Sequence, residues 1–185
     1  MRLRPPDPPL SDGVVQLRPW TDDDVATIAV ACRDPEISRW IDDIPAPYTR
    51  ADARAYVAAS RRGWKDGSLW AFAITDRATG DVLGSCGIGW QDQPHAVAEI
   101  GYWVRSEGRR RGIATRAVRL ASAWSFAECG VQRLQLRADV LNAASQLVAE
   151  RAGFHREGVL RSVRYSRRQQ RRVDFVIYSL LIAEA

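Results

Sequence analysis

The feature that most constrains this chain is a strand, a basic glycine-containing loop and a helix that follow one another without a gap. Residues 100–104 read Ile-Gly-Tyr-Trp-Val, an apolar and aromatic run that favours a strand. The loop at 105–112 is rich in arginine, and beyond it apolar residues recur at helical spacing until Gly130. The first N–H groups of such a helix are free, its dipole is positive there, and glycine lets the backbone approach an anion. The segment therefore predicts a phosphate-binding site.

Length and composition favour one domain that buries its own core. The chain has 185 residues, of which 46% are hydrophobic and 26% charged, as in ordinary globular proteins. We find no apolar run long enough for a membrane span and no signal-peptide pattern, so we expect no membrane association. Cys32, Cys86 and Cys129 are few and widely spaced, which fits a reduced, cytoplasmic protein without a metal site.

The net charge of +5 is carried by arginine in two clusters. Arg109–Arg111 lie in the loop, and we favour phosphate binding for them over a solvent-facing role. The run from Arg161 to Arg172 holds six arginines and no acid, and we favour a solvated face for it. Nucleic-acid binding is the remaining alternative for this run, although it contains no recognisable binding motif, so a nucleic-acid partner is not expected.

The apolar patterns predict an α+β domain. Residues 1–12 carry four prolines and no periodic pattern, which predicts a flexible tail, and residues 13–185 are expected to form one domain. The stretch punctuated by Pro35, Pro45 and Pro47 is expected to be irregular. Strands are expected at 14–17, 69–74, 82–90, 97–104, 133–137, from 154 and at 173–181, and helices at 22–32, 51–64, 113–130 and 143–152.

The motifs in this order resemble those of the GNAT acyl-CoA N-acetyltransferases. The spacing Arg109-x-x-Gly112-x-Ala114 is similar to the signature with which that family binds the CoA pyrophosphate, and it is neither a P-loop nor a three-glycine dinucleotide motif. Further segments resemble the RimJ/RimL-type branch, which includes ribosomal-protein alanine N-acetyltransferases: Leu17-Arg-Pro-Trp20, Ala98 to Val104, Asn142-x-x-Ser145 with Ala152-Gly-Phe154, Glu157 to Arg161, and Val176 to Leu181. The resemblance covers about residues 14–182. It implies the GNAT fold, a mixed but mostly antiparallel sheet flanked by about four helices.

The same resemblance implies acetyl-CoA as the cofactor and a specific way of holding it. The strand at 102–104 would pair with the pantetheine arm and diverge from the strand at 133–138, and an N–H near Trp103 or Val104 would polarise the thioester carbonyl. The residues implied to contact the cofactor are Tyr102, Trp103, Val104, Arg109, Arg110, Arg111, Gly112, Ile113, Ala114, Thr115, Asn142 and Ser145.

Glu99 is the candidate general base, because several GNAT branches place a glutamate one strand-length before the phosphate loop. In an apolar cleft the pKa of this carboxyl would be raised towards neutrality, which suits it to take a proton from an amine. An exposed strand carboxylate or an ion pair is the alternative. Glu157 is a weaker candidate with an expected structural role, and His95 and His155 are expected to be solvated.

The proton donor to the thiolate is where the chain departs from the commonest GNAT pattern. Many members carry a tyrosine four residues before the helix-ending glycine, and that position is Ala149 here. Ser145 is the substitute that the RimJ/RimL-type branch implies, with helix capping beside Asn142 as its alternative role. Some members of the branch carry a further carboxylate where this chain reads Arg164-Tyr165, which counts against a ribosomal-protein N-terminus as acceptor.

The acceptor pocket is expected between the first two predicted helices and residues 159–172. If the basic run there edges the mouth, it would disfavour a polycationic acceptor and favour one that carries a carboxylate or phosphate. Aromatic residues are the candidate lining, with core packing as the alternative: Trp40, Tyr48, Trp64, Trp90 and Tyr165.

These observations predict an N-acetyltransferase that moves the acetyl group of acetyl-CoA to a primary amine by direct attack in a ternary complex. The acceptor would be a protein N-terminus, an amino acid or a small-molecule amine, and the protein a monomer or homodimer. The alternative is a catalytically inactive acetyl-CoA-binding sensor, which the missing tyrosine favours. Similar sequences in this branch serve unrelated amines, so the fold leaves the acceptor open.

Overall fold

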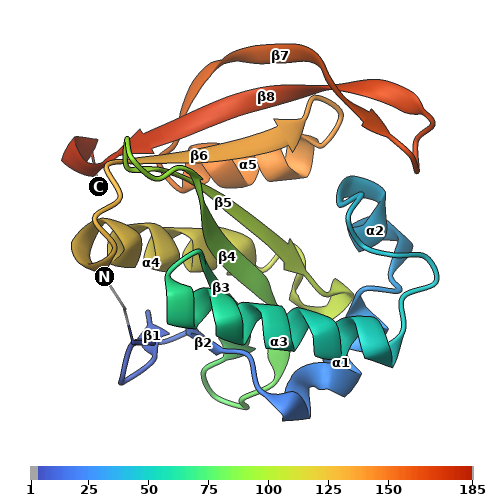
Figure 1. Ribbon diagram of the computed structural model, residues 1–185, viewed down its shortest axis with the longest axis vertical. Helices are drawn as coiled ribbons and strands as arrows, with labels where there is room; N and C mark the ends of the chain where they lie inside the picture. Colours follow the sequence, from blue (N-terminus) through green and yellow to red (C-terminus); the bar gives the residue numbers. More distant parts are fainter. Residues whose placement is uncertain (1–3, 185) are drawn as a thin grey trace.

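One eight-stranded sheet with helices on both faces forms the protein (Figure 1). The computed structural model describes residues 4–184. The strand order is β1-β2-β3-β4-β5-β6-β8-β7, and all neighbours are antiparallel except β5 and β6, which run parallel. The strands are β1 Leu10–Ser11, β2 Val15–Pro19, β3 Leu69–Asp76, β4 Val82–Asp92, β5 Val97–Val104, β6 Arg133–Asp139, β7 His155–Ser166 and β8 Arg171–Leu181. The helices within the described residues are α1 Val25–Ala31, α2 Pro35–Trp40, α3 Arg50–Asp66, α4 Ile113–Glu128 and α5 Ala143–Arg151. This confirms the predicted α+β fold.

Capping residues set the helix ends close to where the sequence predicts them. The carboxylate of Asp52 accepts a hydrogen bond from the Thr49 N–H at 2.8 Å, and the Thr49 hydroxyl accepts one from the Asp52 N–H at 3.2 Å. This capping box begins α3. The side chain of Asn142 accepts from the Ser145 N–H at 3.1 Å, so α5 also begins where expected.

Helix α2 corrects the expectation of an irregular stretch after Pro35. The Asp34 carboxylate accepts a hydrogen bond from the Glu36 N–H at 2.9 Å, and Pro35 occupies the first turn, where a missing N–H costs nothing. The local signals for a short helix are therefore present. The flanking prolines at 45 and 47 belong to the loop that follows it.

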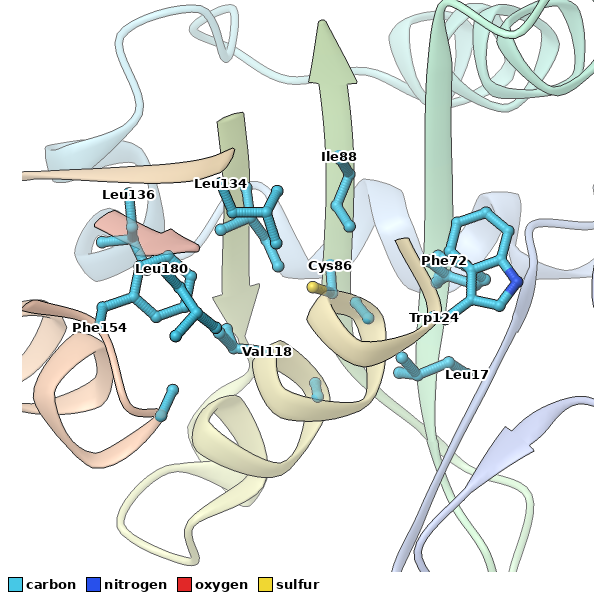
Figure 2. Packing of buried hydrophobic residues seen from close by; sticks show 14 of the residues in the cluster. Leu17, Phe72, Cys86, Ile88, Val118, Trp124, Leu134, Leu136, Phe154 and Leu180 are labelled. Atoms are coloured by element: carbon cyan, nitrogen blue, oxygen red, sulfur yellow. The ribbon is translucent and has the colours of Figure 1, made fainter. Parts of the chain in front are cut away.

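The core lies on both faces of the sheet. Helix α4 covers one face, where Trp124 lies against Phe72, with ring centroids 5.3 Å apart, and Val118 belongs to the same buried cluster (Figure 2). Helices α1 and α3 cover the other face. Trp64, expected among the pocket-lining aromatics, is instead a core residue: it is 5% exposed and its ring centroid lies 5.1 Å from that of Phe72. The structure thus corrects this expectation in favour of core packing.

Strands β5 and β6 pair only over a short distance and then separate. Val97 to Glu99 lie opposite Arg133 to Gln135, and no further pairs form between these two strands over the described residues. In Figure 1 the two strands start side by side and diverge, with α2 near the open end. Strand β4 stays with β5 throughout, and a Cβ atom at Gly84 would lie only 2.2 Å from the Trp103 carbonyl oxygen. Strand β5 therefore stays paired with β4 while it separates from β6.

The N-terminal stretch expected to be a flexible tail contains the short strand β1. Leu10 and Ser11 pair with β2, and Arg116 on α4 donates to Asp12 at 2.7 Å. Residues 1–3 of the expected tail, and residue 185 of the expected domain, lie outside the described residues. No helix between residues 4 and 184 combines the length and hydropathy needed to cross a membrane.

Candidate functional site

Two cavities meet at the point where β5 and β6 separate. The loop-side cavity, next to residues 108–115, has a volume of about 860 Å³, and the sheet-side cavity, next to Glu99, about 750 Å³. Both are lined by the same six residues at their junction: Trp40, Ile41, Tyr102, Trp103, Asn142 and Ser145. A group held in one cavity can therefore reach a group held in the other.

The loop-side cavity brings together nearly all the residues predicted to contact acetyl-CoA. Arg111 is the exception and does not line it. Those that do are Tyr102, Trp103, Val104, Arg109, Arg110, Gly112, Ile113, Ala114, Thr115, Asn142 and Ser145. Arg151, at the end of α5, also lines this cavity and was not predicted from the sequence.

The N-terminus of α4 fits a pyrophosphate. Gly112 precedes the helix with a left-handed φ of 75°, no side chain caps the helix, and a Cβ atom at Gly112 would meet nothing within 4 Å. The first intrahelical bond in this turn is that from the Arg116 N–H to the Gly112 carbonyl, so the N–H groups of residues 113–115 have no intrahelical partner. Free amides and the helix dipole together favour an anion at this place.

The three loop arginines lie in different surroundings. Arg109 forms an ion pair with Asp34 at the start of α2 and donates from Nε to the Val104 carbonyl at 3.2 Å. Arg111 turns away from the cavity towards Asp76, at 3.6 Å. Arg110 lines the cavity and has no hydrogen-bond or ion-pair partner among residues 4–184. Arg110 is thus the loop arginine that is free to meet a phosphate, and its φ of 59° places it in the left-handed region.

Tyr102 and Ser145 meet at the junction of the cavities. Tyr102 on β5 donates its phenol hydrogen to the Ser145 Oγ at 2.9 Å, while the Ser145 N–H is held by Asn142. Burial raises the pKa of Tyr102 to about 12, so the phenol is protonated at neutral pH. The sequence indicated a cofactor contact for Tyr102 through its strand, and this side-chain hydrogen bond was not predicted.

Glu99 lies at the last paired position of β5, on the face of the sheet opposite α4. Its neighbours Ala98 and Ile100 are buried under α4, and side chains alternate along a strand, so Glu99 points into the sheet-side cavity. Its carboxylate forms an ion pair with Arg137 on β6, at 2.5 Å. The ion pair that the sequence left open as an alternative is therefore present. Arg137 also lines the cavity and was missed, because only the pairing of β5 with β6 brings it to Glu99.

The predicted aromatic lining is present in part. Trp40, Tyr48 and Trp90 line the sheet-side cavity, together with Tyr56 and other residues that the sequence did not indicate. Tyr165 lies on β7 outside both cavities, with 52% of its surface exposed. The expected contribution of residues 159–172 to the lining is therefore replaced by the loop between α2 and α3, from which Ile44 and Pro45 reach the cavity.

Half of the arginines between Arg161 and Arg172 are tied to other elements, which corrects the expectation of a solvated face. Arg164 lies 3.5 Å from Asp42 and Arg171 lies 3.5 Å from Asp139. Arg168 donates to the Ile44 carbonyl. With the 2.9 Å hydrogen bond from Ser166 to Asp42, the contacts of Arg164 and Arg168 fasten the tip of the β7–β8 hairpin to the loop between α2 and α3, and that of Arg171 fastens it to the end of β6.

The charge of the sheet-side cavity is therefore acidic and not basic. Among the described residues that line this cavity, Arg137 is the one with a positively charged side chain. The lining carboxylates are Asp43, Asp52, Glu99 and Asp139. None of the six arginines of the basic run is among the described lining residues, so the condition under which the run would favour an acceptor with a carboxylate or phosphate is not met.

Glu157 lies outside both cavities and has a structural role. Its carboxylate accepts from Arg133 at 2.8 Å and from Ser179 at 2.8 Å. The Arg133 guanidinium lowers the pKa of Glu157 to about 2, so this group is a poor base. His95 and His155 are exposed, as expected.

The fold, the strand separation and the amide-lined loop define an acyl-CoA-dependent acyltransferase. Residues 15–155 match the family model described as an acetyltransferase (GNAT) domain, and the chain belongs to this family. It is an N-acetyltransferase that uses acetyl-CoA.

Two relatives of this chain are named as N-acetyltransferases. The uncharacterized N-acetyltransferase p20 of Bacillus licheniformis is 27% identical over 151 residues, which are 82% of this chain and 83% of p20. YdaF of Bacillus subtilis strain 168, provisionally named a ribosomal N-acetyltransferase, is 37% identical over 105 residues, 57% of this chain and 56% of YdaF. The structure of RimJ from Mycobacterium smegmatis, in complex with CoA-disulfide, superposes with a TM-score of 0.83 at 23% identity, covering 95% of this chain and 87% of RimJ. At that identity the structural likeness concerns the fold.

Proposed function

We propose that the enzyme acetylates the primary amine of a peptide or of a small molecule by direct attack on acetyl-CoA in a ternary complex. The observation that carries this proposal is the junction at which six residues line both cavities. Acetyl-CoA in the loop-side cavity and an amine in the sheet-side cavity would meet there without moving, and such positioning supplies much of the rate enhancement in transfer reactions.

On the donor side, the chain would hold the cofactor at its phosphates and at its thioester. Acetyl-CoA supplies the activated acetyl group and a thiol leaving group. Arg110 and the free amides of residues 113–115 would bind the pyrophosphate. A backbone N–H near Trp103 or Val104 would donate to the thioester oxygen, because this part of β5 has no β6 partner.

On the acceptor side, Glu99 would receive the proton that the amine loses. The carboxylate points into the sheet-side cavity and lies where the strands begin to separate. Its ion pair with Arg137 orients it, and a water or the amine itself can use the second carboxylate oxygen.

The lining favours a cationic acceptor. Four carboxylates and one guanidinium line the cavity. Glu99 is paired with Arg137 and Asp139 with Arg171, which leaves Asp43 and Asp52 without an ion-pair partner among residues 4–184. A protonated amine is attracted to such a cavity before it is deprotonated. The name of YdaF, a ribosomal N-acetyltransferase, supports the amine of a protein as one member of this class. Acceptors with a carboxylate or phosphate close to the amine are expected to be poor.

The direct test is the rate of CoA thiol release with a panel of amines. The panel would contain peptides with different N-terminal residues, the matching free amino acids, and small amines with and without an anionic group. We expect turnover with peptides or cationic amines, and at least tenfold lower kcat/KM for the matching free amino acids, whose carboxylate lies beside the amine. A preference for the anionic members would overturn the acceptor class, and binding of acetyl-CoA without turnover on any amine would favour the sensor alternative.

Glu99→Gln tests the base. The variant keeps the shape of the side chain and loses its ability to accept the proton, so kcat should fall by about 10²- to 10⁴-fold. The Kd for acetyl-CoA, measured by calorimetry, should stay within about twofold. Glu157→Gln is the matched control, because Glu157 lies outside both cavities. A kcat that is unchanged in Glu99→Gln would remove Glu99 from the mechanism.

A further inference from the structure

The hydroxyl hydrogen of Ser145 is available to donate a hydrogen bond into the cavities. Its N–H is held by Asn142 and its Oγ accepts the phenol hydrogen of Tyr102 at 2.9 Å. The hydroxyl hydrogen of Ser145 has no acceptor among residues 4–184, although the residue is half-buried and lines both cavities. A hydroxyl whose oxygen is occupied by a donor is free to point its own hydrogen at a ligand.

Helix α5 does not itself provide a phenol at this place. The residue four positions before Gly153 is Ala149, which is fully buried in the core against the sheet. The phenol that reaches the junction comes from β5, since Tyr102 lies on the same face of the strand as Ile100 and extends to the first turn of α5. The described tyrosines that line the sheet-side cavity alone, Tyr48 and Tyr56, do not hydrogen-bond to Ser145.

We propose that Tyr102 is a positioning residue for proton delivery to the leaving thiolate, and that it acts through Ser145. This inference rests on the proposed acetyl transfer. The amine nitrogen bonds to the carbonyl carbon, and the C–S bond breaks with its electron pair on sulfur. Ser145 gives its hydroxyl proton to the sulfur and takes the phenol proton of Tyr102. The phenolate regains a proton from solvent, and the proton lost by the amine leaves through Glu99.

The pair performs this task better than either hydroxyl alone. A serine without a donor behind it would become an alkoxide on giving up its proton, whereas the phenol replaces that proton as it leaves. A donated hydrogen bond also polarises the serine O–H towards sulfur, since hydrogen bonds in a chain strengthen one another. The raised pKa of Tyr102, about 12 because of burial, keeps the phenol protonated between the transfers.

The first measurement is a double-mutant cycle on kcat with Tyr102→Phe, Ser145→Ala and the pair. We expect a loss of about 100-fold for Ser145→Ala and about 10-fold for Tyr102→Phe, within the usual range for proton-transfer catalysis. In the Ser145→Ala background the tyrosine substitution should cost less than about twofold, because the two groups act in one chain. Tyr178→Phe is the control: its phenol also contacts α5, at Glu150 with 3.3 Å, but lies outside both cavities.

The second measurement needs no turnover. The thiol of bound CoA can be titrated by the ultraviolet absorbance of its thiolate. A hydroxyl that donates to the sulfur stabilises the thiolate, so the pKa of the bound thiol should be higher in Tyr102→Phe and in Ser145→Ala than in the wild type, by about half a unit or more. The control Tyr178→Phe should titrate as the wild type does.

The outcomes separate this inference from the proposed function. Turnover by the wild type with additive losses in the cycle and an unshifted thiol titration would overturn the role of Tyr102 and leave the acetyl transfer standing. No turnover by the wild type on any amine would overturn both. A non-additive cycle with a shifted titration would support the inference.

Discussion

The two cavities that meet at the candidate site are built in different ways. The loop-side cavity draws mainly on the segments 102–115 and 141–151, each continuous in sequence, with α2 as its remaining wall. The sheet-side cavity draws on α2, α3, α5, the loops that follow α1 and α2, and five strands. The proposed cofactor end therefore depends on local sequence, whereas the proposed acceptor end depends on how distant elements pack.

The difference extends to charge. The loop-side cavity presents arginine and helix amides, which suit phosphates, and the sheet-side cavity presents mainly carboxylates. Sequence changes in the loop between α2 and α3 or in the β7–β8 hairpin could alter the acceptor without touching the cofactor. This separation explains how one fold serves many amines, and substitutions that affect one cavity should leave the other unchanged.

Among substitutions expected to change binding in one cavity alone, the largest effect is expected for Arg110→Ala. Loss of a charge-assisted contact with the pyrophosphate should weaken CoA binding about 10- to 100-fold, and the loss should shrink at high salt. The KM for the acceptor should not change. Isothermal titration calorimetry at two salt concentrations measures the affinity for CoA. Arg111→Ala is the control, because Arg111 turns away from the cavity to Asp76. Equal weakening in the two variants would mean that only the net charge of the loop matters.

A smaller effect, on the other cavity, is expected for Asp42→Asn. Asp42 accepts from Ser166 at 2.9 Å and pairs with Arg164, so the substitution loosens the loop that supplies Ile44 to the sheet-side cavity. The KM for the acceptor should rise about three- to tenfold while the Kd for CoA stays constant. Asp81→Asn, in the exposed turn between β3 and β4, is the control. A change in CoA affinity instead would show that the cavities are coupled through this loop.

The smallest effect is expected for Glu157→Gln, which should alter neither cavity. The pKa of Glu157 is lowered to about 2 from its ordinary 4.5, so its ion pair stabilises the fold fully above about pH 5 and loses this contribution as the pH falls towards 2. The pair is partly exposed, so we expect the variant to melt only about 2 °C lower at pH 7, and the gap to close by pH 2 to 3. Calorimetric melting curves across this range measure it. A difference in melting temperature between the variant and the wild type that widens on acidification would contradict the stabilising role assigned to the ion pair of Glu157.

The elements that the sequence predicted well are those with a strong local signal. Helix α4 and its loop combine a helical apolar period with a glycine and an arginine cluster, and the structure confirms the expected mostly antiparallel sheet. Helix α2 was missed although Asp34 and Pro35 carry a start signal, because it is only six residues long and prolines follow closely. Trp64 was misplaced because composition does not tell a core aromatic from a lining one.

The roles assigned to Glu99 and Ser145 stay predictions, but their partners are now known. Arg137 lies beside Glu99 because β5 and β6 run parallel in one register, and Tyr102 reaches Ser145 because α5 packs on the face of the sheet that bears the tyrosine. Neither partner could be read from spacing, since the residues are 38 and 43 positions apart.

The sequence by itself indicated the family, most of the element order and the glycine-preceded start of α4, because short-range periodicity, capping and glycine placement act within a few residues. The tertiary structure alone decided which charges line the sheet-side cavity. Six arginines between residues 161 and 172 suggest a basic mouth, yet three of them are neutralised by Asp42 and Asp139 or held by a backbone carbonyl, and carboxylates line the cavity instead. The electrostatic character of a cavity depends on which charges pair across the fold, and that pairing is set by packing between elements far apart in the chain.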